Sequence, residues 1–213
     1  MFVVGHKSKI VQELRSIYDI PIDACPKRFD TFDIKKCKDA VLLDKSRYLF
    51  CHATQISKRL NEQTPKEIEN SLATAISTIA MCEHILENNP IARICIVGSA
   101  DAEIRGCYDT VYCMGKVMVH WFVRTRKLTS PDQQLVCVAP SLLRDGGMVT
   151  CREDLDRVDE RIPYLPKQEF ITCKDVAKAI HFLLYEDNGH ITNTILDMTG
   201  GIHAPMKGEI CPL

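Results

Sequence analysis

Long hydrophobic runs are missing from this sequence of 213 residues. No stretch approaches the roughly eighteen apolar residues that a membrane-spanning helix requires, and the apolar start of "MFVVGHKSK" is too short for a secretory signal peptide. Eleven cysteines occur without a CxxC, an HExxH or a Cys/His cluster at zinc-ligand spacing, so we expect reduced thiols and no metal site. We therefore expect a soluble, cytoplasmic protein with no membrane partner.

An excess of charge of either sign is missing as well. The 27 basic and 28 acidic residues give a net charge of −1. The basic clusters at 35–38 and 124–127 are expected to be solvated helix faces, so no nucleic-acid partner is predicted. Repeats, low-complexity tracts and linkers are also absent, while 46% of the residues are hydrophobic. This composition predicts one folded domain over residues 1–213.

Short apolar runs alternate with segments of helical periodicity along the chain. Strands are expected at 2–4, 20–24, 47–53, 92–99, 134–140 and 192–201, and helices at 8–17, 64–89, 109–127 and 172–187. The alternation predicts an α/β fold with a single doubly wound parallel sheet, Rossmann-like, and helices on both faces. Ligands of such sheets bind outside the carboxyl ends of the strands. Functional residues are therefore expected at those ends.

Three side chains of complementary chemistry lie at or after one of these ends. Ser99 follows the strand predicted at 92–99, and Tyr112 and Lys116 share one face of the next helix. A nearby ammonium lowers a tyrosine pKa from about 10, which suits a general acid or base, and a serine hydroxyl can hold a carbonyl oxygen. A cofactor must supply any hydride, because no side chain can. The alternative is a packed tyrosine beside a surface lysine.

A serine followed thirteen residues later by Tyr-x-x-x-Lys resembles the pattern of the short-chain dehydrogenase/reductase family. The segments "TPKEIENSL" (64–72), "RIPYLPKQEFITCKDVAKAIHFLL" (161–184) and "ITNTILDMTGG" (191–201) are similar to its fourth helix, its late loop and helix, and its closing strand. The resemblance implies an NAD(P)-dependent oxidoreductase that acts on a small carbonyl or alcohol. Residues 141–171 would form its substrate loop.

The same resemblance implies a role for each site residue. Tyr112 would be the acid/base, Lys116 would tune it and position the cofactor ribose, and Ser99 would hold the substrate oxygen. The implied cofactor-binding residues are Gly5, Ser8, Lys9, Ile10, Cys51, His52, Ala53, Tyr112, Lys116, Pro140 and Leu143.

The sequence departs from the family pattern at several positions. Lys9 and Val11 stand where the glycine-rich first turn has two of its three glycines, so the Lys9 side chain either binds a phosphate or blocks the close approach of the backbone. Ser71 is nearest to the family's relay asparagine. These departures leave a second function open, a catalytically silent binding or scaffold protein.

Cofactor preference and assembly complete the expectations. Asp23, at the end of the second predicted strand, could hold a ribose hydroxyl of NAD, whereas Lys27 and Arg28 could bind the extra phosphate of NADP, and both options stay open. The helices expected at 64–89 and 109–127 are apolar on more than one side. Relatives pair these helices, which predicts a homodimer or homotetramer; the alternative is that Trp121 covers its own core.

Overall fold

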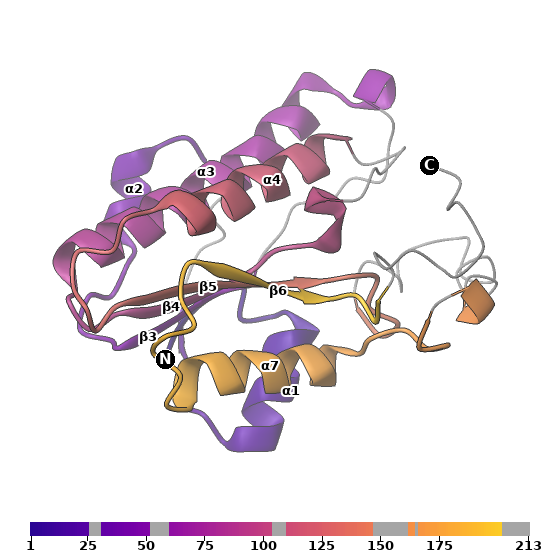
Figure 1. Cartoon of the computed structure of the whole chain (residues 1–213). Coiled ribbons are helices and arrows are strands. Elements are labelled where there is room, and N and C mark those ends of the chain that lie inside the picture. The colour runs from indigo at the N-terminus through magenta and orange to yellow at the C-terminus, as the bar shows by residue number, and fades with distance from the viewer. Residues whose placement is uncertain (26–30, 52–59, 104–109, 147–161, 165, 202–213) are drawn as a thin grey trace.

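The chain is built around one sheet of six parallel strands between two layers of helices (Figure 1). The computed structural model describes residues 1–25, 31–51, 60–103, 110–146, 162–164 and 166–201. Its strands are β1 (Phe2–Val4), β2 (Asp23–Ala24), β3 (Arg47–Phe50), β4 (Arg93–Val97), β5 (Gln134–Pro140) and β6 (Thr194–Met198). The predicted α/β fold with a doubly wound parallel sheet is confirmed.

The order of the strands determines where a ligand can enter. In space the order is β2-β1-β3-β4-β5-β6, so the chain moves outward from β1 to β2 and then returns to the other side of β1. Val4 at the end of β1 pairs with Phe50 at the end of β3. The strand order therefore reverses between these two carboxyl ends, and in open α/β sheets such a reversal opens a crevice for a ligand.

Helices cover both faces of the sheet (Figure 1). On one face lie α2 (Ile34–Asp39), α3 (Pro65–Asn88) and α4 (Thr110–Thr125), and on the other lie α1 (Lys9–Tyr18) and α7 (Cys173–Tyr185). Successive strand residues point to opposite faces, and each face has its own core. Beneath α3 and α4 the strands contribute Phe2, Val4, Tyr48, Phe50, Ile94 and Ile96. Beneath α1 and α7 they contribute Val3, Leu49, Cys51, Cys95, Val97, Val136 and Val138.

Most predicted boundaries agree with the structure. The capping box expected at the start of the long helix is present, because the Thr64 side chain accepts the Glu67 N–H while Glu67 accepts the Thr64 N–H. The polar stretch 33–46, in which a solvated helix face was expected at 35–38, contains α2, whose first turn is capped by Asp33. Burial of Cys37 on this short helix supplies packing that local sequence does not reveal.

No helix in the described part of the chain is long and apolar enough to cross a membrane. Within the same residues, no group of three His, Cys, Asp or Glu side chains could hold a metal ion.

Candidate active site

Lys116 is a buried lysine whose ammonium reaches the carboxyl end of the central strand β4. Its side chain comes from the middle of α4, and only 8% of the residue is exposed. The Nζ donates a hydrogen bond of 2.8 Å to the carbonyl oxygen of Val97, the last residue of β4. Burial lowers the pKa of Lys116, because desolvation disfavours the charged form. Helix α4 thus brings Lys116 to the carboxyl end of β4.

Tyr112 lies one turn before Lys116 and shares its side of α4. The Lys116 Nζ is 5.6 Å from the centre of the Tyr112 ring, and this tyrosine is buried as well. Both side chains line a cavity of about 20 Å³ between the sheet, α3 and α4. Such a cavity has room for about one water molecule. Ser71, the residue nearest by sequence to the family's relay asparagine, lines the same cavity.

Ser99 follows β4 and begins a short 3-10 helix, Ala100–Ala102. Its hydroxyl donates to the Asp101 carboxylate at 3.2 Å and accepts the Asp101 N–H at the same distance. The residue is buried, and two positions separate it from the carbonyl that accepts Lys116. To hold a substrate oxygen, the Ser99 hydroxyl would have to turn away from Asp101. The structure thus gathers the three predicted catalytic residues at the end of β4.

His120 is a buried residue near this site that the sequence did not single out. It lies one turn beyond Lys116, so Tyr112, Lys116 and His120 follow one another at intervals of four along α4. A Cβ built on Gly98 would lie 2.4 Å from His120 Nε2 and 2.6 Å from Cys137 Sγ. Gly98 lies between Val97 and Ser99. His120 therefore packs against the segment that carries the Val97 carbonyl and the Ser99 hydroxyl. The sequence feature that could have indicated this close packing is the glycine before Ser99, which leaves room for a neighbouring side chain.

The His120 ring is held without hydrogen bonds from the described residues. Both ring nitrogens are buried and lack a hydrogen-bond partner there, and the nearest Glu103 oxygen is 3.7 Å from Nδ1. Burial lowers the pKa of His120 to about 4. The imidazole is therefore neutral at pH 7, which keeps a second positive charge away from Lys116.

The first turn after β1 leads directly into the start of α1. Gly5 has a φ of 87°, a left-handed conformation that favours glycine, and its carbonyl accepts the Ser8 N–H at 2.9 Å. Ser8 is the N-cap residue of α1, but its side chain caps no N–H and lies 3.1 Å from Cys51 Sγ instead. The first turn of α1 also has no acidic residue, whereas α3 has Glu67 and α7 has Asp175 there.

A helix start that its own N-cap side chain leaves uncapped, beside the switch point, fits an anionic group, because the first N–H groups carry the positive end of the helix dipole. Gly5, Ser8, Lys9 and Ile10, the residues predicted to bind the cofactor here, form this turn and the start of α1. The residues present fit the pyrophosphate of a nicotinamide dinucleotide at this turn.

Lys9 does not point freely into the solvent at this turn. Its Nζ forms an ion pair of 3.1 Å with Asp145, which lies after β5 and also accepts the N–H of Cys173 at 2.8 Å. The hydrogen bond that Lys9 donates to the Asp145 carboxylate raises the pKa of Lys9. The lysine that replaces a glycine is thus tied to the loop after β5, close to where α7 begins. Neither of the two roles considered for Lys9 from sequence included this partner.

The remaining predicted cofactor residues fall into two groups. Cys51 follows β3, Pro140 ends β5, and Leu143 packs against the core beneath α1 and α7, so all three lie on the carboxyl side of the sheet. His52 and Ala53 lie outside the described residues.

Asp23 lies elsewhere than expected. It begins β2 instead of ending it, and its carboxylate forms an ion pair of 3.3 Å with Lys45, which precedes β3. Both residues therefore lie on the amino side of the sheet, away from the carboxyl ends where a cofactor ribose would bind. The structure does not support the option of Asp23 as a ribose ligand, because Asp23 pairs with Phe2, the first residue of β1. Lys27 and Arg28 lie outside the described residues.

Solved structures of similar shape match almost the whole chain. A short-chain dehydrogenase from Burkholderia cenocepacia in complex with NADP superposes with a TM-score of 0.80, at 16% identity, over 95% of this chain and 97% of that one. The chain has the short-chain dehydrogenase/reductase fold. The ligand-free aldohexose dehydrogenase of Thermoplasma acidophilum matches this fold with a TM-score of 0.78, at 16% identity, over 98% of this chain and 96% of its own.

Sequence similarity to short-chain dehydrogenase/reductases is weaker than similarity of fold. No family model matches the sequence. The 3-oxoacyl-acyl-carrier-protein reductase FabG of Buchnera aphidicola is 24% identical over 134 residues. That alignment covers 61% of this chain and 54% of the reductase, so the chain matches about half of the relative's length. A 3-oxoacyl-acyl-carrier-protein reductase of Agrobacterium tumefaciens with NADP bound has a TM-score of 0.78, at 17% identity, over 93% of this chain and 92% of its own.

Proposed function

We propose that this chain is an NAD(P)-dependent oxidoreductase that transfers a hydride between a nicotinamide cofactor and a small carbonyl or alcohol. The observation that carries the proposal is the placement of Lys116, a buried lysine whose ammonium meets the end of β4 one helical turn from Tyr112. A structural lysine would more often keep its charge in water, because burial of an ammonium is costly. The similarity to reductases and dehydrogenases supports the same reading.

Each residue has a defined task in this reaction. Tyr112 donates a proton to the substrate oxygen during reduction and removes it during oxidation. The positive charge of Lys116 favours the tyrosinate and thereby makes that transfer easier near neutral pH. Ser99, once it turns from Asp101, donates a hydrogen bond to the same oxygen and fixes its position. The cavity beside Ser71 offers a place through which a proton could reach Lys116.

The cofactor would lie across the switch point. The uncapped start of α1 after Gly5 would hold its pyrophosphate, and Lys116 would reach its ribose. The nicotinamide supplies the hydride, and the protein supplies position and protons. Neighbours of the same fold have NADP bound, which supports a nicotinamide cofactor and leaves the choice between NAD and NADP open.

The substrate and the domain boundaries are further parts of the proposal. One domain over 1–213 would hold the cofactor, and residues 141–171, of which 147–161 lie outside the described part, would select the substrate. The names of similar proteins suggest 3-oxoacyl thioesters and aldoses as the first compounds to test. A cytoplasmic location stays an expectation from the sequence.

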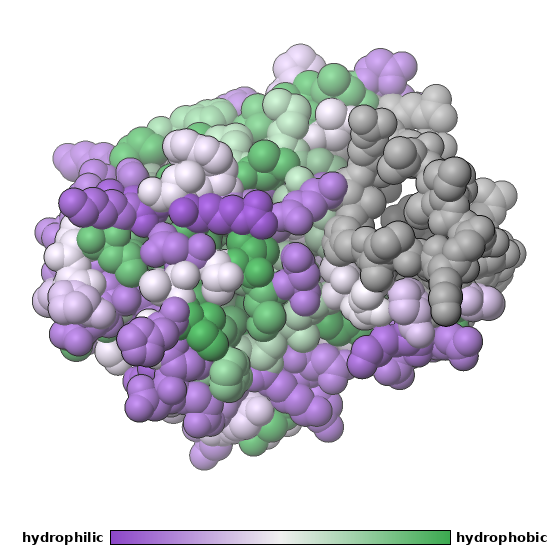
Figure 2. Space-filling view, viewed as in Figure 1, coloured by the Kyte–Doolittle hydropathy of each residue, from purple (hydrophilic) through white to green (hydrophobic). Residues whose placement is uncertain are grey.

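A homodimer or homotetramer is the assembly that we propose. Figure 2 shows hydrophobic residues among hydrophilic ones over the layer that contains α3 and α4. Met114, Val117 and Trp121 lie on one side of α4, and 68% of Trp121 is exposed. A second copy would cover this face by a symmetric contact. Light scattering at tens of micromolar should show a dimer or tetramer that Trp121→Glu dissociates, and a monomer at that concentration would refute the assembly.

The proposed function is tested by titrating the protein with NADH and NADPH while following the melting temperature. A ligand that binds only the native state stabilises it by about 2.7 kcal/mol at one hundred times Kd, or roughly 5–10 °C for a chain of this length. We expect such a rise with at least one cofactor, and a similar rise for Tyr112→Phe, which keeps the ring. No shift with either cofactor at millimolar concentration would favour the catalytically silent binding protein.

A further inference from the structure

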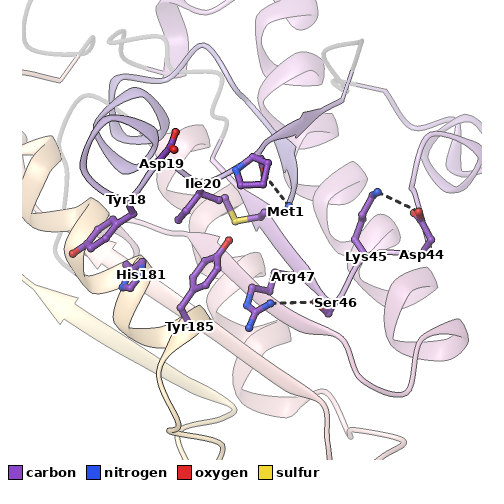
Figure 3. Close-up of a pocket in the computed structure, with 11 residues that line it drawn as sticks. Met1, Tyr18, Asp19, Ile20, Asp44, Lys45, Ser46, Arg47, His181 and Tyr185 are labelled. Atoms are coloured by element: carbon purple, nitrogen blue, oxygen red, sulfur yellow. Dashed lines mark hydrogen bonds and ion pairs between the residues drawn. The ribbon is translucent and has the colours of Figure 1, made fainter.

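A second cavity lies at the amino side of the sheet, across the strands from Ser99 and Lys116. Its volume is about 470 Å³, within the range of small-ligand sites. The end of α1, the residues before β3 and the end of α7 form its walls (Figure 3). The proposed oxidoreductase reaction uses none of these residues. The cavity is therefore a separate feature of the fold.

Arg47 is a cationic side chain of this cavity that forms no ion pair with a carboxylate of the described residues. Its Nε donates to the Leu184 carbonyl at 2.8 Å and its Nη1 donates to Ser46 Oγ at 3.3 Å. A guanidinium has five N–H donors, so three remain, and no carboxylate in the described part of the chain forms an ion pair with it. Lys45, the other cationic side chain in the wall, is instead paired with Asp44 at 3.1 Å and with Asp23 at 3.3 Å.

A stack of aromatic rings holds Arg47 in place. Its guanidinium carbon lies 4.4 Å from the centre of the Tyr185 ring. Tyr185 stacks on His181 at 4.9 Å, and His181 stacks on Tyr18 at 3.6 Å, with both pairs nearly parallel. The charge is thus oriented before any ligand arrives, which reduces the entropy that binding would cost. A guanidinium that only capped α7 would need neither three open donors nor a cavity in front of it.

The other walls define what could lie beside the charge. In Figure 3 the hydroxyl end of Tyr185 is directed toward Met1 and Ile20, and Arg47 lies next to it. No hydrogen bond to that hydroxyl occurs among the described residues, so it can donate to a ligand. Met1, Ile20 and Pro21 supply an apolar surface opposite.

Most negatively polarised groups around the cavity, carbonyls at helix ends and carboxylates, already have hydrogen-bond or ion-pair partners. Helices α1 and α7 both end here, and helix ends attract cations. The last carbonyls of α7 are already taken, because Arg93 donates to Leu183 and Glu186 while Arg47 donates to Leu184. Asp44 is held by Lys45, which leaves Asp19 as the one carboxylate in the wall that forms no ion pair with a described residue. Arg47 is therefore the side chain of the wall that offers an unpaired positive charge, and the Met1 ammonium, which donates to the Pro21 carbonyl at 3.0 Å, adds a second one.

We propose that this cavity is a second binding site, for a small organic oxyanion, a carboxylate or a phosphate ester, whose charged end meets Arg47 and Tyr185 and whose apolar body packs on Met1, Ile20 and Pro21. The guanidinium binds an oxyanion through paired N–H donors, and the apolar wall favours an anion with an apolar body over a bare inorganic ion. The site is independent of the proposed oxidoreductase activity.

The test is calorimetric titration of the full chain with phenyl phosphate, benzoate and uncharged benzyl alcohol at constant ionic strength. We expect phenyl phosphate or benzoate to bind with a Kd below about 1 mM and benzyl alcohol to bind at least ten-fold more weakly. The relative strength of the two anions distinguishes a phosphate site from a carboxylate site. Equal binding of benzyl alcohol, or no binding of either anion, would overturn the proposal.

Variants then locate the binding. Arg47→Met should weaken the anion ten-fold or more, because it removes the charge and its donors. Tyr185→Phe keeps the ring stack and should weaken binding by a smaller factor. This second variant tests the site even if Arg47→Met fails to fold. Lys66→Met removes a charge paired with Glu69 on α3, and Lys9→Glu alters the predicted cofactor turn. Both should bind like the parent; a loss in either would show binding elsewhere.

Discussion

Replacement of Gly98 by alanine tests how closely the segment before Ser99 is packed. The added Cβ would lie 2.4 Å from His120 Nε2, 2.6 Å from Cys137 Sγ and 3.0 Å from His120 Cδ2. Ordinary contacts between such atoms are about 3.5–4.0 Å, so both neighbours would have to retreat by roughly 1 Å. His120 and Cys137 are themselves buried, at 3% and 0% exposure, which leaves them little room.

The expected cost follows from this overlap. Overpacking of a filled core costs about 1–3 kcal/mol, and for a chain of this length each kcal/mol lowers the melting temperature by roughly 2–4 °C. Gly98→Ala should therefore melt about 2–12 °C below the parent. Turnover should fall as well, because the segment that shifts carries the Val97 carbonyl on Lys116 and the hydroxyl of Ser99.

Thermal and urea unfolding measure the effect, and the chain offers a matched control. An alanine Cβ at Gly189 would meet nothing within 4 Å, so Gly189→Ala should stay within about 0.5 kcal/mol of the parent. Adding His120→Ala to Gly98→Ala removes one of the two clashes, so the double variant should be less unstable than the sum of the two singles. Additive effects, or a Gly98→Ala variant as stable as Gly189→Ala, would refute the reasoning.

Three further predictions concern the site. Tyr112→Phe should reduce turnover by roughly 10²–10⁴-fold while the protein remains folded and binds cofactor, because it removes general acid catalysis; an unchanged rate would exclude Tyr112 as the acid. Lys9→Glu should weaken NADPH binding in titrations, whereas Lys9→Gly should cost little and Asp145→Asn, which frees the ammonium, should tighten it; parental affinity in all three would exclude this turn as the cofactor site. The pKa of His120 is lowered to about 4 in the folded state, against about 6.5 in the unfolded chain. The contribution of neutral His120 to the free energy of unfolding is therefore fully present above pH 6.5. It falls by about 3 kcal/mol as the pH drops toward 4, because only the unfolded chain gains the proton. His120→Gln should flatten this part of the pH profile of unfolding free energy, and an unchanged slope would contradict the assignment.

Much of the fold could be predicted from local pattern because the strongest elements are also the most regular. The apolar run at 92–99 became the central strand β4, buried on both faces, and the capping signal at Thr64 marks the start of α3. The second strand was predicted too long, since its apolar residues pack against Met1 and α1 beyond the two residues that pair with β1. The basic cluster at 35–38 indicated a helix face, but the bounds of a helix as short as α2 depend on tertiary packing.

The site shows the same division. The spacing of Ser99, Tyr112 and Lys116 implied a shared location because helix and strand periodicities fix which side chains share a face. Contacts between residues that are far apart in the sequence could not be predicted from such periodicities. The ion pair of Lys9 with Asp145, the contact of His120 with Gly98 and the stack on Arg47 each join segments separated by long stretches of sequence. Residues of these types fit many surroundings, so their contacts emerge only from the fold.

Hydride transfer itself is the central claim, and isotope labelling tests it directly. The protein would be incubated with NADPH or NADH carrying deuterium at C4 of the nicotinamide, together with 3-oxoacyl thioesters, aldoses and simple aldehydes, and products analysed by mass spectrometry. The account predicts that deuterium appears on the former carbonyl carbon of at least one substrate. The rate of this deuterium transfer should fall at least about 100-fold in Tyr112→Phe. Label at no carbonyl carbon above the Tyr112→Phe background, with a cofactor shown to be bound, would contradict it.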